Sequence, residues 1–159
     1  MDSPEKAIDA VKSFLKQFDD HREARRRLEQ LYEDYDKWNA LVDFLKDRVR
    51  ELEGRDEGHV AERIEMLERM ADIYRDELGL DVMVINTLGE ILELDPSHGA
   101  AFDELREMLE KNRRWNDLAE LLSQRAEDAI EAGDISRAVE DLLDVANVCA
   151  KHGVSIPPL

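Results

Sequence analysis

Apolar positions recur at helical spacing along almost the whole chain. The clearest case is the range 59–78, where residues step by four and three along one face: Val60, Ile64, Leu67, Ala71, Tyr74 and Leu78. A second stripe beside it carries Met66, Met70 and Ile73, so this helix is expected to be packed on two sides.

The same spacing predicts about eight helices and no strand. Their expected ranges are 3–18, 22–35, 38–52, 59–78, 81–94, 98–111, 115–131 and 135–151, with a tail at 153–159. The last helix is expected to bury a stripe formed by Ile135, Val139, Leu142, Leu143, Ala146 and Cys149. Because the connections are short, consecutive helices are expected to be antiparallel neighbours within a single all-α domain spanning 1–159.

The chain also repeats itself. Trp38-Asn39-Ala40-Leu41 and Trp115-Asn116-Asp117-Leu118 lie 77 positions apart, and many other residues match at this offset: Ile8 and Ile85, Leu28 and Leu105, Leu45 and Leu122, Arg48 and Arg125. A long period of this kind predicts a stacked helical array. Each tryptophan is expected to begin a helix after a tight turn and to hold adjacent helices together, so its replacement by Ala would cost about 3–5 kcal/mol if the ring is buried.

Gly89 lies inside the fifth predicted helix, where it costs about 1 kcal/mol relative to Ala. Two explanations remain. The residue faces solvent, which we favour, or a neighbouring helix approaches closely there.

The charge balance bears on the partner. Of the 159 residues, 38% are charged, and the net charge is −17. Nucleic acid and anionic membrane surfaces are disfavoured because phosphate binding needs clustered cations. A basic protein segment is the electrostatically favoured partner. The alternative is that the charge only keeps an elongated protein soluble.

The expected location is the cytoplasm. Cys149 is the only cysteine, so an internal disulfide is excluded and a reducing compartment fits. The start of the sequence has no basic and apolar leader, and no stretch approaches the ~20 apolar residues that a membrane span requires.

Candidate chemistry is sparse, and we expect no catalytic residue, metal site or cofactor. The four histidines, His21, His59, His98 and His152, show no metal-ligand spacing. Cys149 and His152 are three positions apart, but Cys149 lies on an apolar stripe and is expected to be a buried structural thiol.

Several motifs resemble the tetratricopeptide repeat in the degenerate form of large bacterial repeat proteins. They are Leu94-Asp95-Pro96 after a helix, Ala71 and Tyr74 upstream, Gly79 at the turn, and the phrases Ser3–Ile8 and Arg114–Leu122. Val84, Ile91, Arg106 and Glu29 depart from the family's pattern. The resemblance implies a right-handed superhelix of antiparallel helix pairs, an α-solenoid, that acts as a protein-binding scaffold.

In this family the first helix of each pair lines a concave groove. Carried over position by position, the groove residues are Arg26, Gln30, Glu33, Glu68, Asp72, Arg75, Asp103, Glu107, Glu110 and Asn147. Six of the ten are acidic and two are basic, so the implied ligand is a basic segment of a partner protein. Family variants that clamp a carboxyl-terminal peptide need a specific combination of Lys, Arg and Asn at such positions, and this groove lacks that combination, so this ligand mode is rejected.

The two ends predict an alternative role. Phe14 and Phe18 near one end, and Val145 and Val148 near the other, are expected to lack neighbours. The terminal helices of different copies would then pair head to tail in a self-assembling structural subunit. The competing explanation is that the chain belongs to a longer array.

Overall fold

The structure is a computed structural model that describes residues 3–53 and 57–158; positions 1–2, 54–56 and 159 lie outside the described residues. Within them the chain forms eight α-helices and no strand, which confirms the all-α prediction.

The chain divides between Gly79 and Leu80 into two compact units. Unit 1 contains α1 (Pro4–Leu15), α2 (Arg22–Asp34), α3 (Trp38–Glu53), a 3₁₀ turn η1 (Glu57–His59), α4 (Val60–Asp72) and a π-helical turn η2 (Ile73–Leu78). Unit 2 contains α5 (Asp81–Leu94), α6 (Gly99–Lys111), α7 (Trp115–Glu131) and α8 (Ile135–His152). Residues 154–158 form no helix, as expected for the tail.

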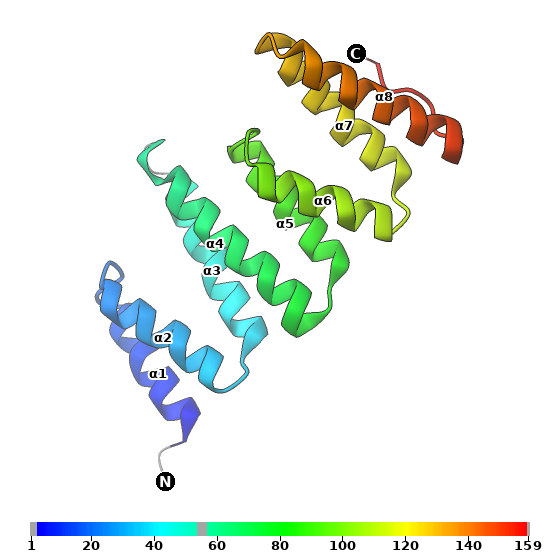
Figure 1. The fold of residues 1–159 in the computed structure, drawn as a ribbon. Helices are drawn as coiled ribbons and strands as arrows, with labels where there is room; N and C mark the ends of the chain where they lie inside the picture. Colours follow the sequence, from blue (N-terminus) through cyan, green and yellow to red (C-terminus); the bar gives the residue numbers. More distant parts are fainter. Residues whose placement is uncertain (1–2, 54–56, 159) are drawn as a thin grey trace. The chain divides into compact units, whose positions relative to one another are not determined.

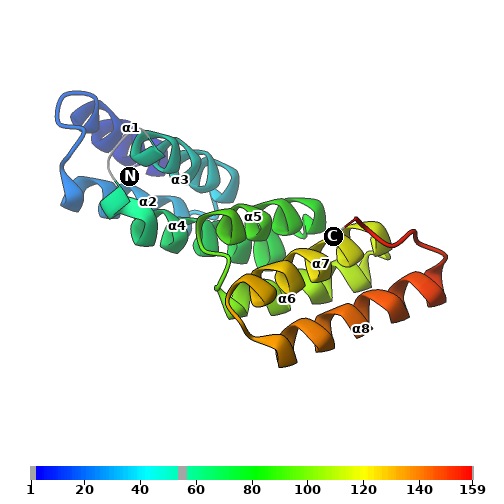
Figure 2. The ribbon, with the colours of Figure 1, turned by 90° about the horizontal axis from the view of Figure 1, so that it is seen from above.

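Each unit is built in the same way. In unit 1, α1 packs on α2, α2 on α3, and α3 on α4, and in unit 2 the chain of contacts runs through α5, α6, α7 and α8 (Figure 1). Consecutive helices within a unit run in opposite directions, which the turned view also shows (Figure 2).

The 77-residue repeat is reproduced in the backbone turns. Asp36 and Arg113, which are 77 positions apart, have positive φ angles of 52° and 54°. After them Lys37 donates its amide to the Tyr32 carbonyl at 2.7 Å, and Arg114 makes the equivalent bond to Leu109 at 2.9 Å. These turns immediately precede α3 and α7, so Trp38 and Trp115 each begin a helix, as predicted.

The helix starts repeat as well. The His21 side chain caps α2 by accepting the Ala24 amide at 3.2 Å, and the His98 side chain caps α6 through Ala101 at 3.1 Å. Side-chain acceptors at this position satisfy an amide that the helix leaves unpaired. Two of the four histidines therefore act as helix caps in equivalent positions.

The core repeats with the same register. Equivalent leucines are buried in both units: Leu28 with Leu105, Leu41 with Leu118, and Leu45 with Leu122. Each contributes about 2 kcal/mol of hydrophobic stabilisation. The sequence repeat is thus a repeat of packing.

The structure differs from two of the predicted helices in detail. The first helix ends at Leu15 instead of 18, and the helix expected over 59–78 changes to a π-helical turn at Ile73. A π turn holds one more residue than an α turn, and such turns occur inside longer helices.

The exposed face of α8 was also predicted wrongly. Ala138, Val145 and Cys149 are buried, whereas Ile135, Val139 and Leu143 are 60%, 50% and 60% exposed. Two apolar stripes run along this helix, and the described residues cover only the one with the smaller side chains. The prediction that Val145 lacks neighbours therefore fails. Phe14 (41%) and Phe18 (54%) are exposed, but the Phe14 ring lies 4.9 Å from the Phe18 ring and 5.2 Å from the His21 ring, so these residues do not lack neighbours either.

Candidate functional site

The ten predicted groove residues fall into two sets, one in each unit. In unit 1, Arg26, Gln30 and Glu33 lie on α2, Glu68 and Asp72 on α4, and Arg75 in η2. In unit 2, Asp103, Glu107 and Glu110 lie on α6 and Asn147 on α8. We call the α2–α4 surface and the α6–α8 surface the two-helix faces of units 1 and 2.

Arg69 joins the two helices of the unit 1 face. From α4 it donates hydrogen bonds to Glu29 and Glu33 on α2. Burial lowers the pKa of Arg69, but the hydrogen bonds and charges of Glu33 and Glu29 outweigh it and raise the pKa above its ordinary value. Glu33 is therefore both a predicted groove residue and a part of the internal packing.

Arg75, one of the two basic groove residues, is also paired within the unit. It donates to Asp72 at 2.6 Å and to Asp76 at 3.0 Å. The hydrogen bond from Arg75 lowers the pKa of Asp76. Gln30 donates to Asp34 at 2.8 Å on the same face.

The unit 2 face has its own arginine between two acids. Arg106 on α6 lies 3.3 Å from Glu110 one turn along and 3.1 Å from Asp144 on α8. Burial lowers the pKa of Arg106, but the bond to Glu110 and the charges of Asp144 and Glu110 raise it overall. Asp103, Glu107 and Asn147 are exposed on this face.

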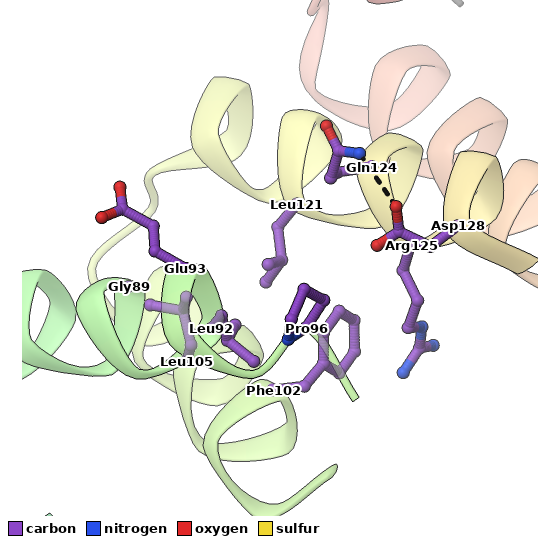
Figure 3. Close-up of a pocket in the computed structure, with 10 residues that line it drawn as sticks. All are labelled: Gly89, Leu92, Glu93, Pro96, Phe102, Leu105, Leu121, Gln124, Arg125 and Asp128. Atoms are coloured by element: carbon purple, nitrogen blue, oxygen red, sulfur yellow. Dashed lines mark hydrogen bonds between the residues drawn. The ribbon is translucent and has the colours of Figure 1, made fainter. Parts of the chain in front are cut away.

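A feature absent from the sequence prediction is a cleft in unit 2. It has a volume of about 380 Å³ and is lined by α5, α6 and α7 (Figure 3). The lining residues are Gly89, Leu92, Glu93, Pro96, Phe102, Leu105, Leu121, Gln124, Arg125 and Asp128. We call it the unit 2 cleft.

Unit 1 contains a cleft at the equivalent positions. It measures about 170 Å³ and is lined by Leu15, Asp19, Arg25, Phe44, Asp47, Arg48 and Glu51. Each of these residues lies 77 positions before a residue of the unit 2 cleft. The only sign of these clefts in the sequence was the match of Arg48 with Arg125 in the 77-residue repeat. That match alone does not predict a cleft.

Arg125 is held on two sides. It donates to the Asp141 carboxylate through Nε at 2.8 Å and through Nη2, and Asp141 is only 1% exposed. Its guanidinium carbon lies 3.5 Å from the centre of the Phe102 ring, in a cation–π contact. The bidentate bond and the ring fix the guanidinium in one orientation.

Cys149 and the two histidines that do not cap helices have structural contacts of their own. Cys149 is 7% exposed, as expected for a structural thiol. The His152 ring stacks on Trp115 with 3.6 Å between ring centroids, and His59 lies 3.2 Å from Glu62. Over residues 3–53 and 57–158, no group of three or more His, Cys, Asp or Glu side chains is arranged to hold a metal ion.

No protein-family model matches the chain, and comparison with curated proteins finds no significant match. In the part of the chain that the structure describes, no helix combines the length and apolar character that crossing a membrane requires.

Proposed function

We propose that the chain is a non-catalytic protein-binding module of the tetratricopeptide-like kind, which recruits a basic segment of a partner protein in the cytoplasm. In this proposal the helices continue as a right-handed superhelix of antiparallel pairs, and the two-helix faces present the acidic groove. Neither cofactor nor metal takes part.

The observation that supports this proposal is the balance of paired and exposed charges on the faces. Arg69, Arg75 and Arg106 each lie between two acids of the same unit, so their positive charges are compensated internally. On the unit 2 face Asp103 and Glu107 are exposed, and on the unit 1 face the acids Glu68 and Asp72 are exposed together with the cation Arg26. The faces therefore keep a negative potential, which attracts a cationic segment and accelerates its association.

The test is the binding of a fluorescent Lys- and Arg-rich peptide to the full chain at increasing salt. Reversing Asp72→Lys and Glu107→Lys together should weaken binding about tenfold at low salt, because each exposed pair contributes up to about 1 kcal/mol. The control reverses two exposed acids away from the faces, Glu120→Lys and Glu131→Lys, so that the net charge changes equally.

The control should leave the affinity within about twofold of that of the unmodified chain. The proposal fails if ionic strength does not affect the affinity. It also fails if the two double variants weaken binding equally, because the peptide would then respond only to net charge.

A second candidate is self-assembly through the terminal helices, which the exposed face of α8 favours. Ile135, Val139 and Leu143 are spaced one turn apart and form an uncovered apolar stripe. At the other end of the chain, Phe14 is 41% exposed, whereas its equivalent Ile91 on α5 is fully buried. Both terminal helices thus carry apolar surface that a second copy would cover in a head-to-tail contact.

Light scattering after size-exclusion chromatography separates the two candidates. Self-assembly predicts a mass that rises with concentration and falls to that of one chain in the variant Val139→Asp/Leu143→Asp. A single-chain mass at every concentration contradicts self-assembly and leaves the peptide-binding proposal unaffected.

A further inference from the structure

The unit 2 cleft has the walls of a pocket for an apolar side chain. Leu92 from α5, Leu121 from α7, and Phe102 and Leu105 from α6 surround it, and Pro96 borders it (Figure 3). Its volume of about 380 Å³ lies within the range of small-ligand pockets and accommodates one large aromatic or aliphatic side chain.

Gly89 keeps one side of this cleft open. A Cβ built at Gly89 has no atom within 4 Å outside its own helix, which confirms that no neighbouring helix approaches it closely. The equivalent residue in unit 1 is Lys12. A side chain at position 89 would therefore extend over the cleft without clashing with the fold.

Arg125 gives the cleft a fixed polar edge. Asp141 and Phe102 hold its guanidinium, so binding a ligand does not cost it further side-chain entropy. The guanidinium N–H groups that do not bond to Asp141 are suited to donate to a backbone carbonyl of a bound segment.

The remaining charges of the cleft are negative. Glu93 is exposed, and the half-buried Asp128 accepts a hydrogen bond from Gln124 at 3.1 Å. Because Asp141 compensates Arg125, these two carboxylates determine the potential. A second hollow of about 260 Å³ shares Pro96, Phe102, Arg125 and Asp128 with the cleft, which leaves room for a residue next to the bound side chain.

We infer that the unit 2 cleft binds a protein segment in which a large apolar side chain, best an aromatic one, is flanked by Lys or Arg. The apolar side chain fills the cleft between Leu92 and Leu121, and the flanking cations pair with Glu93 and Asp128. The inference rests on the proposed protein-binding function and adds a second contact, with its own chemistry, to the acidic faces.

The unit 1 cleft is unsuited to the same ligand. Arg25 replaces Phe102 there and bonds to the Asp19 carbonyl and to Asp20, so a charged side chain occupies the apolar floor. The volume is less than half as large, about 170 Å³ against about 380 Å³. The chain thus carries its own internal control.

The test uses the full ¹⁵N-labelled chain and the blocked tripeptide acetyl-Lys-Trp-Lys-amide, followed by NMR. Signals of the Gly89 and Leu121 amides and the Gln124 side chain should shift saturably, with a Kd on the order of 1 mM for so small a ligand. Acetyl-Lys-Gly-Lys-amide and acetyl-Glu-Trp-Glu-amide should each bind at least about tenfold more weakly, because one lacks the anchor and the other reverses the charge.

The variant Gly89→Gln should raise the Kd at least about tenfold by extending a neutral side chain over the cleft, whereas Gly89→Ala should leave it within about twofold. Both variants retain the fold because position 89 is open and helical. Gln is chosen over the lysine of unit 1 because an added charge would itself repel the cationic probe.

Three outcomes overturn the inference: no saturable shift at the cleft, equal shifts at Phe44 in the unit 1 cleft, or unchanged binding in Gly89→Gln. Asp72→Lys and Glu107→Lys should leave tripeptide binding within about twofold, since neither residue lines the cleft. If those reversals weaken the basic peptide while the tripeptide fails to bind, the cleft inference alone is wrong.

Discussion

The clefts of units 1 and 2 show how the two copies of the repeat have diverged on the same backbone. Equivalent helices line both, and each contains an arginine at the same position, Arg48 or Arg125. In unit 1 this arginine pairs with the exposed acids Glu51 and Glu62, whereas in unit 2 it pairs with a buried acid, Asp141. The backbone therefore determines where a cleft lies, and a few side chains determine whether it is polar or apolar.

The two-helix faces diverge in another way. Each has an arginine between two acids. One of these acids is equivalent in the two units: Glu33 pairs with the arginine of unit 1, and Glu110 pairs with the arginine of unit 2. The arginine stands on the second helix in unit 1, as Arg69 on α4, and on the first helix in unit 2, as Arg106 on α6. Exchanging the helix that carries the cation preserves the attraction between neighbouring helices, so the packing survives a change in sequence that breaks the repeat.

The largest difference between the units should appear on removing the acid that holds the cleft arginine. Asp141→Ala leaves the guanidinium of Arg125 without its carboxylate in a site where the acid is 1% exposed, and should lower the free energy of unfolding by about 3 kcal/mol. The matched change Glu51→Ala removes a 54% exposed partner of Arg48 and should cost at most about 1 kcal/mol. Urea denaturation followed by circular dichroism measures both. Equal losses would show that burial does not distinguish the two ion pairs.

The two tryptophans should differ by less. Both are half-buried, so the cost of 3–5 kcal/mol expected for a buried ring does not apply, and Trp38→Ala should cost about 2 kcal/mol. Trp115→Ala should cost about 1 kcal/mol more, because its ring stacks on His152 at 3.6 Å. A double-mutant cycle with His152→Ala isolates the stacking contribution. A coupling near zero would mean that the stack adds nothing beyond burial.

The tryptophans also illustrate which features of the fold the sequence predicts and which it does not. Helix ranges were predictable because apolar spacing and turn residues are local, and the repeat was predictable because Trp38 and Trp115 recur in the same phrase. Burial was less predictable, because it depends on what covers a face. On α8 the larger stripe, with Ile135 and Leu143, looked like the core but is exposed.

The candidate sites were predictable only in part. Glu33 and Glu110 were placed on helix faces by the family resemblance. The resemblance did not identify their arginine partners, and Arg69, the partner of Glu33, lies on another helix. A carboxylate such as Asp141 looks like a solvated residue in the sequence and is buried only because α7 places Arg125 against it. The ion-pair partners and the buried carboxylate were therefore not predictable, because both depend on contacts between helices.

A smaller contrast lies in the equivalent turns before α3 and α7. Asp36 and Arg113 both have positive φ angles, near 52° and 54°, in the left-handed region. This conformation costs a residue with an ordinary Cβ about 1 kcal/mol, but Asp tolerates it better. Arg113→Gly should therefore raise the free energy of unfolding by about 0.5–1 kcal/mol, and Asp36→Gly should change it by less than about 0.3 kcal/mol. Thermal unfolding of the two variants tests the difference, and an equal gain would contradict it.

The smallest contrast concerns pH and is confined to unit 2. Asp81 at the start of α5 accepts hydrogen bonds from Lys111 at 3.0 Å and Asn112 at 3.2 Å, and these bonds lower its pKa. A lowered pKa in the folded state means that the contribution to stability is present above the unfolded-state pKa and is lost as pH falls through the folded-state value.

In unit 1 the position of Asp81 is occupied by Pro4, which has no carboxylate, so the equivalent hydrogen bonds do not form. Carboxyl ¹³C NMR should show Asp81 titrating below the ordinary range of aspartate. The variant Lys111→Met/Asn112→Ala should move its pKa back up, because the donors that stabilise the carboxylate are gone. Raising the salt concentration should weaken only the charged part of the shift, since the Asn112 bond is neutral. If the pKa of Asp81 is the same in both proteins, these side chains do not hold the end of α6 to the start of α5.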